Sequence, residues 1–263
     1  MIEYFLNLNH IAQAFIATTF TWLITAMGSA IVFFFKKVNK TFMDGMLGFA
    51  AGVMIAASFW SLLSPSIEMA TSLKMNAWLT ATLGFLAGGV LLFIGDKIFD
   101  ALNKNKSNNS KKRVMMLISS ITIHNIPEGL AVGIAFGSIN YGLEGATIIS
   151  ACLLALGIGL QNFPEGSAVS IPLLREGYSR RKAFFYGGLS AIVEPISGII
   201  GALLVLKIRL LLPFLLAFAA GAMIYVVVEE LIPESQTNQK KDYMALFTLI
   251  GFSIMMILDV ALG

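Results

Sequence analysis

The sequence HNIPEG occupies residues 124–129, and a near copy, QNFPEG, occupies residues 161–166. Both hexapeptides lie inside long apolar segments. Residues four apart share one face of a helix, so His124 lies next to Glu128, and Gln161 lies next to Glu165. Each proline lacks an N–H and frees backbone carbonyl groups, which a membrane interior tolerates only beside protein or a wet cavity. The repeated pattern predicts that both segments border one polar cavity.

The composition around these hexapeptides is that of a polytopic membrane protein. The chain has 263 residues, of which 57% are hydrophobic and 13% are charged, and its mean hydropathy is +0.81. A membrane-spanning helix needs about 20 apolar residues. We therefore expect an all-α fold and a single transmembrane domain over residues 1–263. Eight membrane-spanning helices are predicted, at residues 10–35, 45–64, 77–95, 114–137, 144–172, 183–206, 210–232 and 243–262.

The basic residues indicate how the spans are oriented. Alternate loops hold 15 of the 18 lysines and arginines, which leaves Lys74, Lys207 and Arg209 for the opposite side. Basic loops stay on the cytoplasmic side of a membrane, so both termini are predicted to face outward. Residues 1–10 contain no lysine or arginine and no small-residue cleavage site, so we expect no removable signal peptide.

A second internal similarity joins the second and seventh spans. The sequence GFAAGVMI at residues 48–55 reappears as AFAAGAMI at residues 217–224. The predicted orientation sends these two spans across the membrane in opposite directions, as in the inverted repeats of transporters. Spans four and five, which carry the hexapeptides, then lie between two groups of three spans. The predicted arrangement is 3+2+3 with inverted repeats.

Four polar or soft side chains reach nearly the same depth in the membrane. We count about 1.5 Å per residue from the charged residue at the inner end of each span. By this count Met54, His124, Gln161 and Glu194 all lie about 15–21 Å deep. Because the hydrocarbon core is about 30 Å thick, these side chains can meet near its middle.

Three carboxylates at this depth suggest a bound cation. Glu128, Glu165 and Glu194 have no lysine or arginine nearby in the sequence. A charged side chain at the centre of a lone membrane helix costs about 2.5–3.5 kcal/mol. A divalent cation is the simplest counter-charge, and protonated, hydrogen-bonded carboxyls are the alternative. His124 adds an imidazole, which is a common metal donor.

The other candidate ligands each have two interpretations. The amides of Asn125, Gln161 and Asn162 are either metal ligands or hydrogen-bonding groups between helices. Met54 is one of 13 methionines, and packing alone explains most of these. The chemistry of these residue types leaves both interpretations open.

Small residues indicate where helices approach closely. Gly129, Gly133 and Gly137 recur every four residues on the side of the helix that faces away from the His124 and Glu128 side chains. We expect this side to contact another helix. The single cysteine, Cys152, excludes an intramolecular disulfide and a thiolate metal cluster.

Taken together, these residues make the chain resemble the ZIP family of metal-ion transporters, the Zrt- and Irt-like proteins. The resemblance rests on H-N-x-P-E-G in span four followed by x-N-x-P-E-G in span five. It covers essentially all eight spans and is closest to the bacterial and organellar branch. The resemblance implies uptake of Zn²⁺ and related ions into the cytoplasm, across a bacterial inner membrane, through a site between spans two, four, five and six.

The resemblance also implies which residues bind the metal. A primary site falls on Met54, His124, Glu128, Gln161 and Glu165. An adjoining site shares the last two glutamates and adds Asn125, Asn162 and Glu194. Some relatives have aspartate at the position of Asn162, so this chain lacks one anionic ligand of the second site.

The resulting hypothesis is a secondary transporter that imports Zn²⁺, with Cd²⁺, Fe²⁺ and Mn²⁺ as alternative ions. Imidazole, carboxylate and thioether donors argue against Mg²⁺, which prefers oxygen. The metal is the substrate, and no prosthetic group, nucleic-acid partner or ATP-binding motif is expected. A metal-gated channel and an intramembrane metalloenzyme are the alternatives, but His-Glu-x-x-His is absent and we predict no enzyme. The expected partners are metal ions and the lipid bilayer, and a homodimer is left open.

Overall fold

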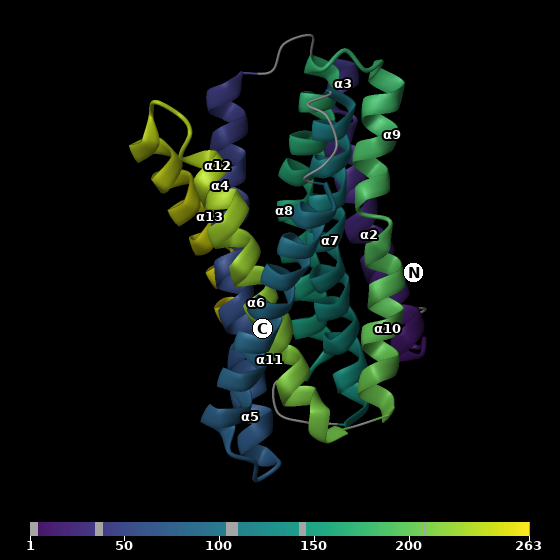
Figure 1. The fold of residues 1–263 in the computed structure, drawn as a ribbon. Helices are drawn as coiled ribbons and strands as arrows, with labels where there is room; N and C mark the ends of the chain where they lie inside the picture. Colours follow the sequence, from purple (N-terminus) through teal and green to yellow (C-terminus); the bar gives the residue numbers. More distant parts are fainter. Residues whose placement is uncertain (1–4, 35–38, 104–109, 142–145, 208, 263) are drawn as a thin grey trace.

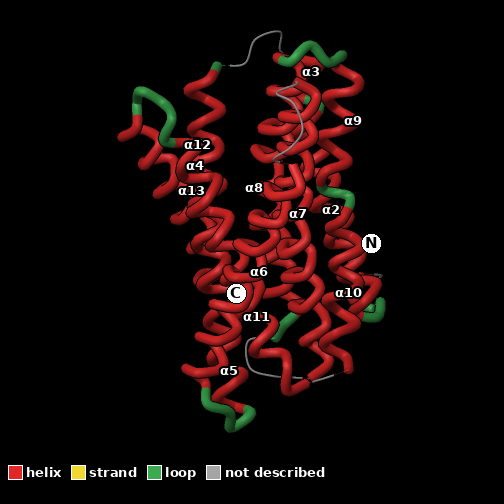
Figure 2. Tube along the Cα trace, viewed as in Figure 1, coloured by secondary structure: helices red, strands yellow, loops and turns green. Residues whose placement is uncertain are grey.

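The apolar segments of the sequence form long helices (Figure 1). The computed structural model describes residues 5–34, 39–103, 110–141, 146–207 and 209–262, and these residues form helices and loops without a strand (Figure 2). The α-helices are α2 (His10–Ser29), α3 (Ile31–Phe34), α4 (Lys40–Ala57), α5 (Ser64–Ser72), α6 (Ala77–Asn103), α7 (Ser110–Ser138), α8 (Ile148–Arg175), α9 (Arg180–Ser190), α10 (Val193–Lys207), α11 (Leu212–Val226), α12 (Ile232–Ser235) and α13 (Lys241–Leu262). Two segments are π-helical, η1 (Ser58–Leu63) and η4 (Val227–Leu231), and two are 3-10 helices, η2 (Ile139–Tyr141) and η3 (Arg209–Leu211).

Seven helical segments among the described residues are long and apolar enough to cross a membrane. They are His10–Phe34, Lys40–Ser72, Ala77–Ile98, Ile148–Leu174, Arg180–Val205, Leu212–Ser235 and Lys241–Ala261. Each segment overlaps a predicted span, which confirms an all-helical, polytopic integral membrane protein. The helix α7 covers the fourth predicted span and continues through Pro127.

The helices pack as two groups that lie side by side (Figure 1). In one group, α2 packs on α8 and α10, and α10 packs on α7. In the other group, α4 packs on α13, and α11 packs on α6. The groups meet where α4 contacts α8 and where α11 contacts α7. The two helices that carry the hexapeptides therefore lie at the boundary between the groups.

Glycines allow α7 to approach α10 closely. A Cβ atom on Gly129 would lie 2.8 Å from the Cα atom of Glu194, and one on Gly133 would lie 2.9 Å from that of Gly198. A Cβ atom on Gly137 would lie 3.0 Å from the Cα atom of Ala202. Only hydrogen fits in these spaces, which confirms the close helix contact predicted from the glycine spacing.

The sixth predicted span, residues 183–206, is interrupted in the middle. Its two parts, α9 and α10, are separate helices, and Glu194 lies in the first turn of α10. Pro195 has no N–H to donate to the carbonyl of Ala191, so a regular helix cannot continue there. The N–H of Glu194 donates to that carbonyl instead, at 3.0 Å. The span was predicted, but the interruption beside Glu194 was not.

Two hydrogen bonds connect the two ends of a helix pair in the same way. The hydroxyl of Ser66 in α5 donates to the carbonyl of Pro213 in α11 at 2.6 Å, and the hydroxyl of Ser235 in α12 donates to the carbonyl of Asp44 in α4 at 2.8 Å. The two donors are 169 residues apart, and so are the two acceptors. Each serine also follows a π-helical segment, η1 or η4. The same local structure therefore occurs twice, with the two hydrogen bonds exchanged between the halves of the chain.

Candidate metal site

Most of the candidate ligands come from the two helices that contain the hexapeptides. The helix α7 provides Asn125 and Glu128, and α8 provides Gln161, Asn162 and Glu165. Both helices remain continuous through their prolines. The three- and four-residue spacings therefore keep these polar side chains on one face of each helix.

The described candidates are buried in the protein interior. The exposed fraction is at most 6% for Met54, Asn125, Glu128, Gln161, Asn162, Glu165 and Glu194. Glu128 and Glu194 both lie within electrostatic reach of Glu165. Burying charged groups away from water is costly unless they are paired and hydrogen-bonded. The partners of each carboxylate therefore indicate its role.

The contact between α7 and α8 leaves oxygen atoms without partners. The side-chain amide of Gln161 donates from Nε2 to Oε1 of Glu128 at 2.6 Å. Among the described atoms, Oε2 of Glu128, Oε1 of Gln161 and both amide atoms of Asn125 are buried without a hydrogen-bond partner. An unsatisfied buried polar group costs about 1–3 kcal/mol, and native proteins contain few of them. Three buried oxygens without donors have the chemistry of cation ligands.

The carboxylate of Glu194, in contrast, is hydrogen-bonded through both oxygens. The side-chain amide of Asn162 donates from Nδ2 to Oε1 at 2.9 Å and to Oε2 at 3.0 Å. The hydroxyl of Thr21 also donates to Oε2. Because Thr21 lies in α2, these hydrogen bonds join α2, α8 and α10 around one carboxylate.

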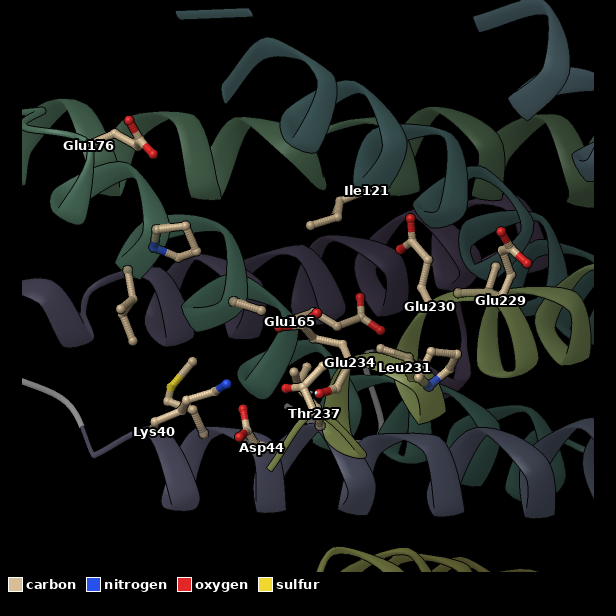
Figure 3. A pocket seen from close by; sticks show the side chains of 17 residues that line it. Lys40, Asp44, Ile121, Glu165, Glu176, Glu229, Glu230, Leu231, Glu234 and Thr237 are labelled. Atoms are coloured by element: carbon tan, nitrogen blue, oxygen red, sulfur yellow. Dashed lines mark hydrogen bonds between the residues drawn. The ribbon is translucent and has the colours of Figure 1, made fainter. Parts of the chain in front are cut away.

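A cavity of about 620 Å³ extends to Glu165 from the end of the molecule where α4 begins and α8 ends (Figure 3). Its described lining includes one lysine, Lys40, and many carboxylates: Asp44, Glu165, Glu176, Glu229, Glu230 and Glu234. Figure 3 shows Glu165, Glu230 and Glu234 around the same space. The cavity therefore provides an acidic route to the buried site.

The described contacts do not join all of the predicted ligands. Met54 is buried in α4, which packs on α8, but no described polar contact links it to the carboxylates. His124 lies one turn before Glu128 in α7, and its side chain is outside the described part of the structure. Within the described residues, no three His, Cys, Asp or Glu side chains form a group that could hold a metal ion. The described donor set therefore depends on the amides of Asn125 and Gln161 as well as on carboxylates.

Thr21 is a site residue that sequence reasoning missed. It is buried with Thr18 and Thr25 on one face of α2. Their spacing of three and four residues is that of a single helix face, and hydroxyl groups in an apolar span often contact other helices. This spacing was the available signal, but it does not indicate which carboxylate the hydroxyl contacts.

Comparisons with known proteins point to one family. A family model described as ZIP Zinc transporter matches residues 103–259, which is more than half of the chain. The chain is 38% identical to zinc transporter ZIP11 of Homo sapiens, over 97% of this chain and 98% of the relative. It is 33% identical to zinc transporter ZupT of Streptococcus mutans, over 97% and 98%, and 32% identical to zinc transporter ZIPB of Bordetella bronchiseptica, over 98% and 84%. The chain therefore belongs to the ZIP family, whose members are zinc transporters and not enzymes.

Proposed function

We propose that this chain is a secondary transporter that imports Zn²⁺ into the cytoplasm through a metal site in the middle of the membrane. The observation that carries the proposal is the set of unpartnered buried oxygens on Asn125, Glu128 and Gln161. A divalent cation would give these oxygens a partner and would balance the charge of Glu128 and Glu165. The relatives are named zinc transporters, which supports Zn²⁺ as the substrate.

The ion would be held by oxygen atoms of Glu128, Gln161 and Glu165. His124 would add an imidazole from α7, and Met54 would add a thioether from α4. This mixture of donors suits ions of intermediate softness, so Cd²⁺, Fe²⁺ and Mn²⁺ are alternative substrates and Mg²⁺ is not. The bacterial relatives ZupT and ZIPB support a bacterial inner membrane as the location.

We infer eight membrane spans in a 3+2+3 arrangement, with α7 as the fourth span. The exchanged serine bonds support two inverted repeats, because the same pair of positions recurs after 169 residues. A second observation has the same offset. Gly166 of α8 packs against the backbone of Thr25, Gly129 of α7 packs against the backbone of Glu194, and 169 residues separate these two contacted positions.

The cavity and the basic loops together support inward transport. Lys40, Arg180 and Lys241 begin α4, α9 and α13 at the same end of the molecule, the upper end in Figure 1. The cavity lining includes Lys40 and Glu176 at this end. Basic loops stay in the cytoplasm, so the cavity would open to the cytoplasm and both termini would face outward. An acidic lining would attract the released cation toward that opening.

Uptake of Zn²⁺ into proteoliposomes that contain the full-length chain tests this proposal. The double variant Glu128→Ala, Glu165→Ala should abolish uptake. The control variant Asp242→Asn removes an exposed carboxylate in the first turn of α13 and should keep the wild-type rate. Unchanged uptake by the double variant would exclude the proposed site. Metal binding without flux would favour the metalloenzyme, and flux at channel rates would favour the metal-gated channel.

A further inference from the structure

The candidate ligands divide into two groups that differ in their hydrogen bonds. The first group, Asn125, Glu128 and Gln161, has buried oxygens without partners. The second group, Asn162 and Glu194, is hydrogen-bonded within the protein. An oxygen that already accepts hydrogen bonds from the protein must lose them before it binds a metal ion. The two groups are therefore not equally ready to act as ligands.

The orientation of the Asn162 amide follows from its neighbours. Three oxygens surround the atom Nδ2: Oε1 and Oε2 of Glu194 at 2.9 and 3.0 Å, and the backbone carbonyl oxygen of Thr21 at 3.3 Å. Carbonyl and carboxylate oxygens only accept hydrogen bonds, so an amide oxygen in this place would have no donor. The amide nitrogen therefore belongs there. It occupies the side of Glu194 from which a second metal ion would have to be bound.

Glu194 has further partners that do not depend on a metal ion. The hydroxyl of Thr21 donates to Oε2. Glu194 also lies in the first turn of α10, a helix of 15 residues, where free backbone N–H groups favour negative charge. Its exposed fraction is 0%, so these contacts replace water entirely. The carboxylate is stabilised by α2, α8 and α10 together.

We propose that this chain binds one metal ion in its membrane site, not two, and that Asn162 and Thr21 are positioning residues that keep Glu194 from coordinating metal. This inference deepens the proposed function and rests on it. The single ion is held by the group with unpartnered oxygens, together with Glu165. Glu194 instead joins α2, α8 and α10 beside the ion.

The substitution Asn162→Asp should reverse this arrangement with little change in volume. It replaces the donor beside Glu194 with a second carboxylate, so that two carboxylates face each other without a hydrogen-bond donor. A second divalent cation is then their best available partner, as in sites where carboxylates hold two metal ions about 3.5–4 Å apart. The matched control is Thr21→Val, which removes one donor to Glu194 but adds no ligand.

The test counts the metal ions bound to the purified full-length protein in detergent. The protein is dialysed to equilibrium against Zn²⁺ or Cd²⁺, and bound metal per chain is measured by mass spectrometry. We expect one ion for the wild type and for Thr21→Val, and two for Asn162→Asp. Thr21→Val should also lower the Tm of the metal-free protein, because Glu194 loses a hydrogen bond.

The outcomes separate this inference from the proposed function. Two ions bound by the wild type would overturn the inference but leave the transport proposal intact. One ion bound by folded Asn162→Asp would overturn the positioning role of Asn162. If Asn162→Asp does not fold, the wild-type count alone decides between one ion and two. A wild type that binds no metal would instead contradict the proposed function.

Discussion

Substituting Gly129 by alanine should push α7 away from α10. The new Cβ atom would lie 2.8 Å from the Cα atom of Glu194, whereas carbon atoms normally approach to about 3.5–4.0 Å. The helices must therefore separate by about 1 Å. Such overpacking costs about 1–3 kcal/mol, and the upper end applies here because backbone atoms cannot rotate away. Alanine regains about 1 kcal/mol of helix propensity, so the net loss is about 2 kcal/mol.

Thermal unfolding in detergent measures this loss, with Gly95→Ala as the matched control. Gly95 also lies within a long helix, α6, but a Cβ atom there would meet nothing within 4 Å. The control should therefore gain about 0.5–1 kcal/mol from helix propensity alone. A difference near 3 kcal/mol corresponds to a Tm difference of about 6–12 °C for a chain of this size.

The same two variants test whether the contact matters for the metal site. Gly129 follows Glu128 directly and packs against Glu194, so Gly129→Ala should also weaken Zn²⁺ binding and slow uptake. Gly95→Ala should leave both unchanged. Equal Tm values for the two variants would refute the close contact between α7 and α10. A lowered Tm with unchanged Zn²⁺ affinity would show that this contact does not position Glu128.

Three further predictions follow from the site and the fold. The variant Gln161→Leu removes an unpartnered oxygen, so Zn²⁺ affinity in calorimetry should fall about tenfold or more, a loss of about 1.4 kcal/mol; a change below about twofold would exclude Gln161 as a ligand. Neutralising Glu230 with Glu230→Gln should slow uptake at low ionic strength and have less effect in high salt, because salt screens the charge of the cavity; a loss that does not depend on salt would contradict an electrostatic role. Ser66→Ala and Ser235→Ala should each lower the free energy of unfolding by about 0.5–1.5 kcal/mol. Their effects should add, because the two hydrogen bonds share no partner, and chemical unfolding of the single and double variants would reveal a departure from this sum.

The sequence was sufficient to predict the position of the membrane spans and the proline-containing helices. Apolar length determines where a helix can cross a membrane, and this property is local. The glycine spacing in α7 was equally readable, because helix periodicity places Gly129 and Gly133 on one face. The contact of α7 with α10 followed this expectation.

The partners of the buried polar groups were not predictable in the same way. Whether Glu194 contacts Thr21, Asn162 or a metal ion depends on how three helices rotate and tilt against one another, and the sequence of one helix does not contain this information. The interruption at Ala191 had a visible cause in Pro195. Pro127 and Pro164 lie inside continuous helices, however, so a proline alone does not distinguish a break from an unbroken helix.

The exchanged serine bonds also have a consequence for how the chain is made. Ser66 reaches its acceptor, Pro213, only after nearly 150 further residues have left the ribosome. The packing partners of α4 and α6, which are α13 and α11, are likewise translated late. The early helices must therefore wait in the bilayer, without their final neighbours, until the last third of the chain is inserted. Biogenesis of this protein thus depends on lipids or an insertion factor shielding those surfaces during synthesis.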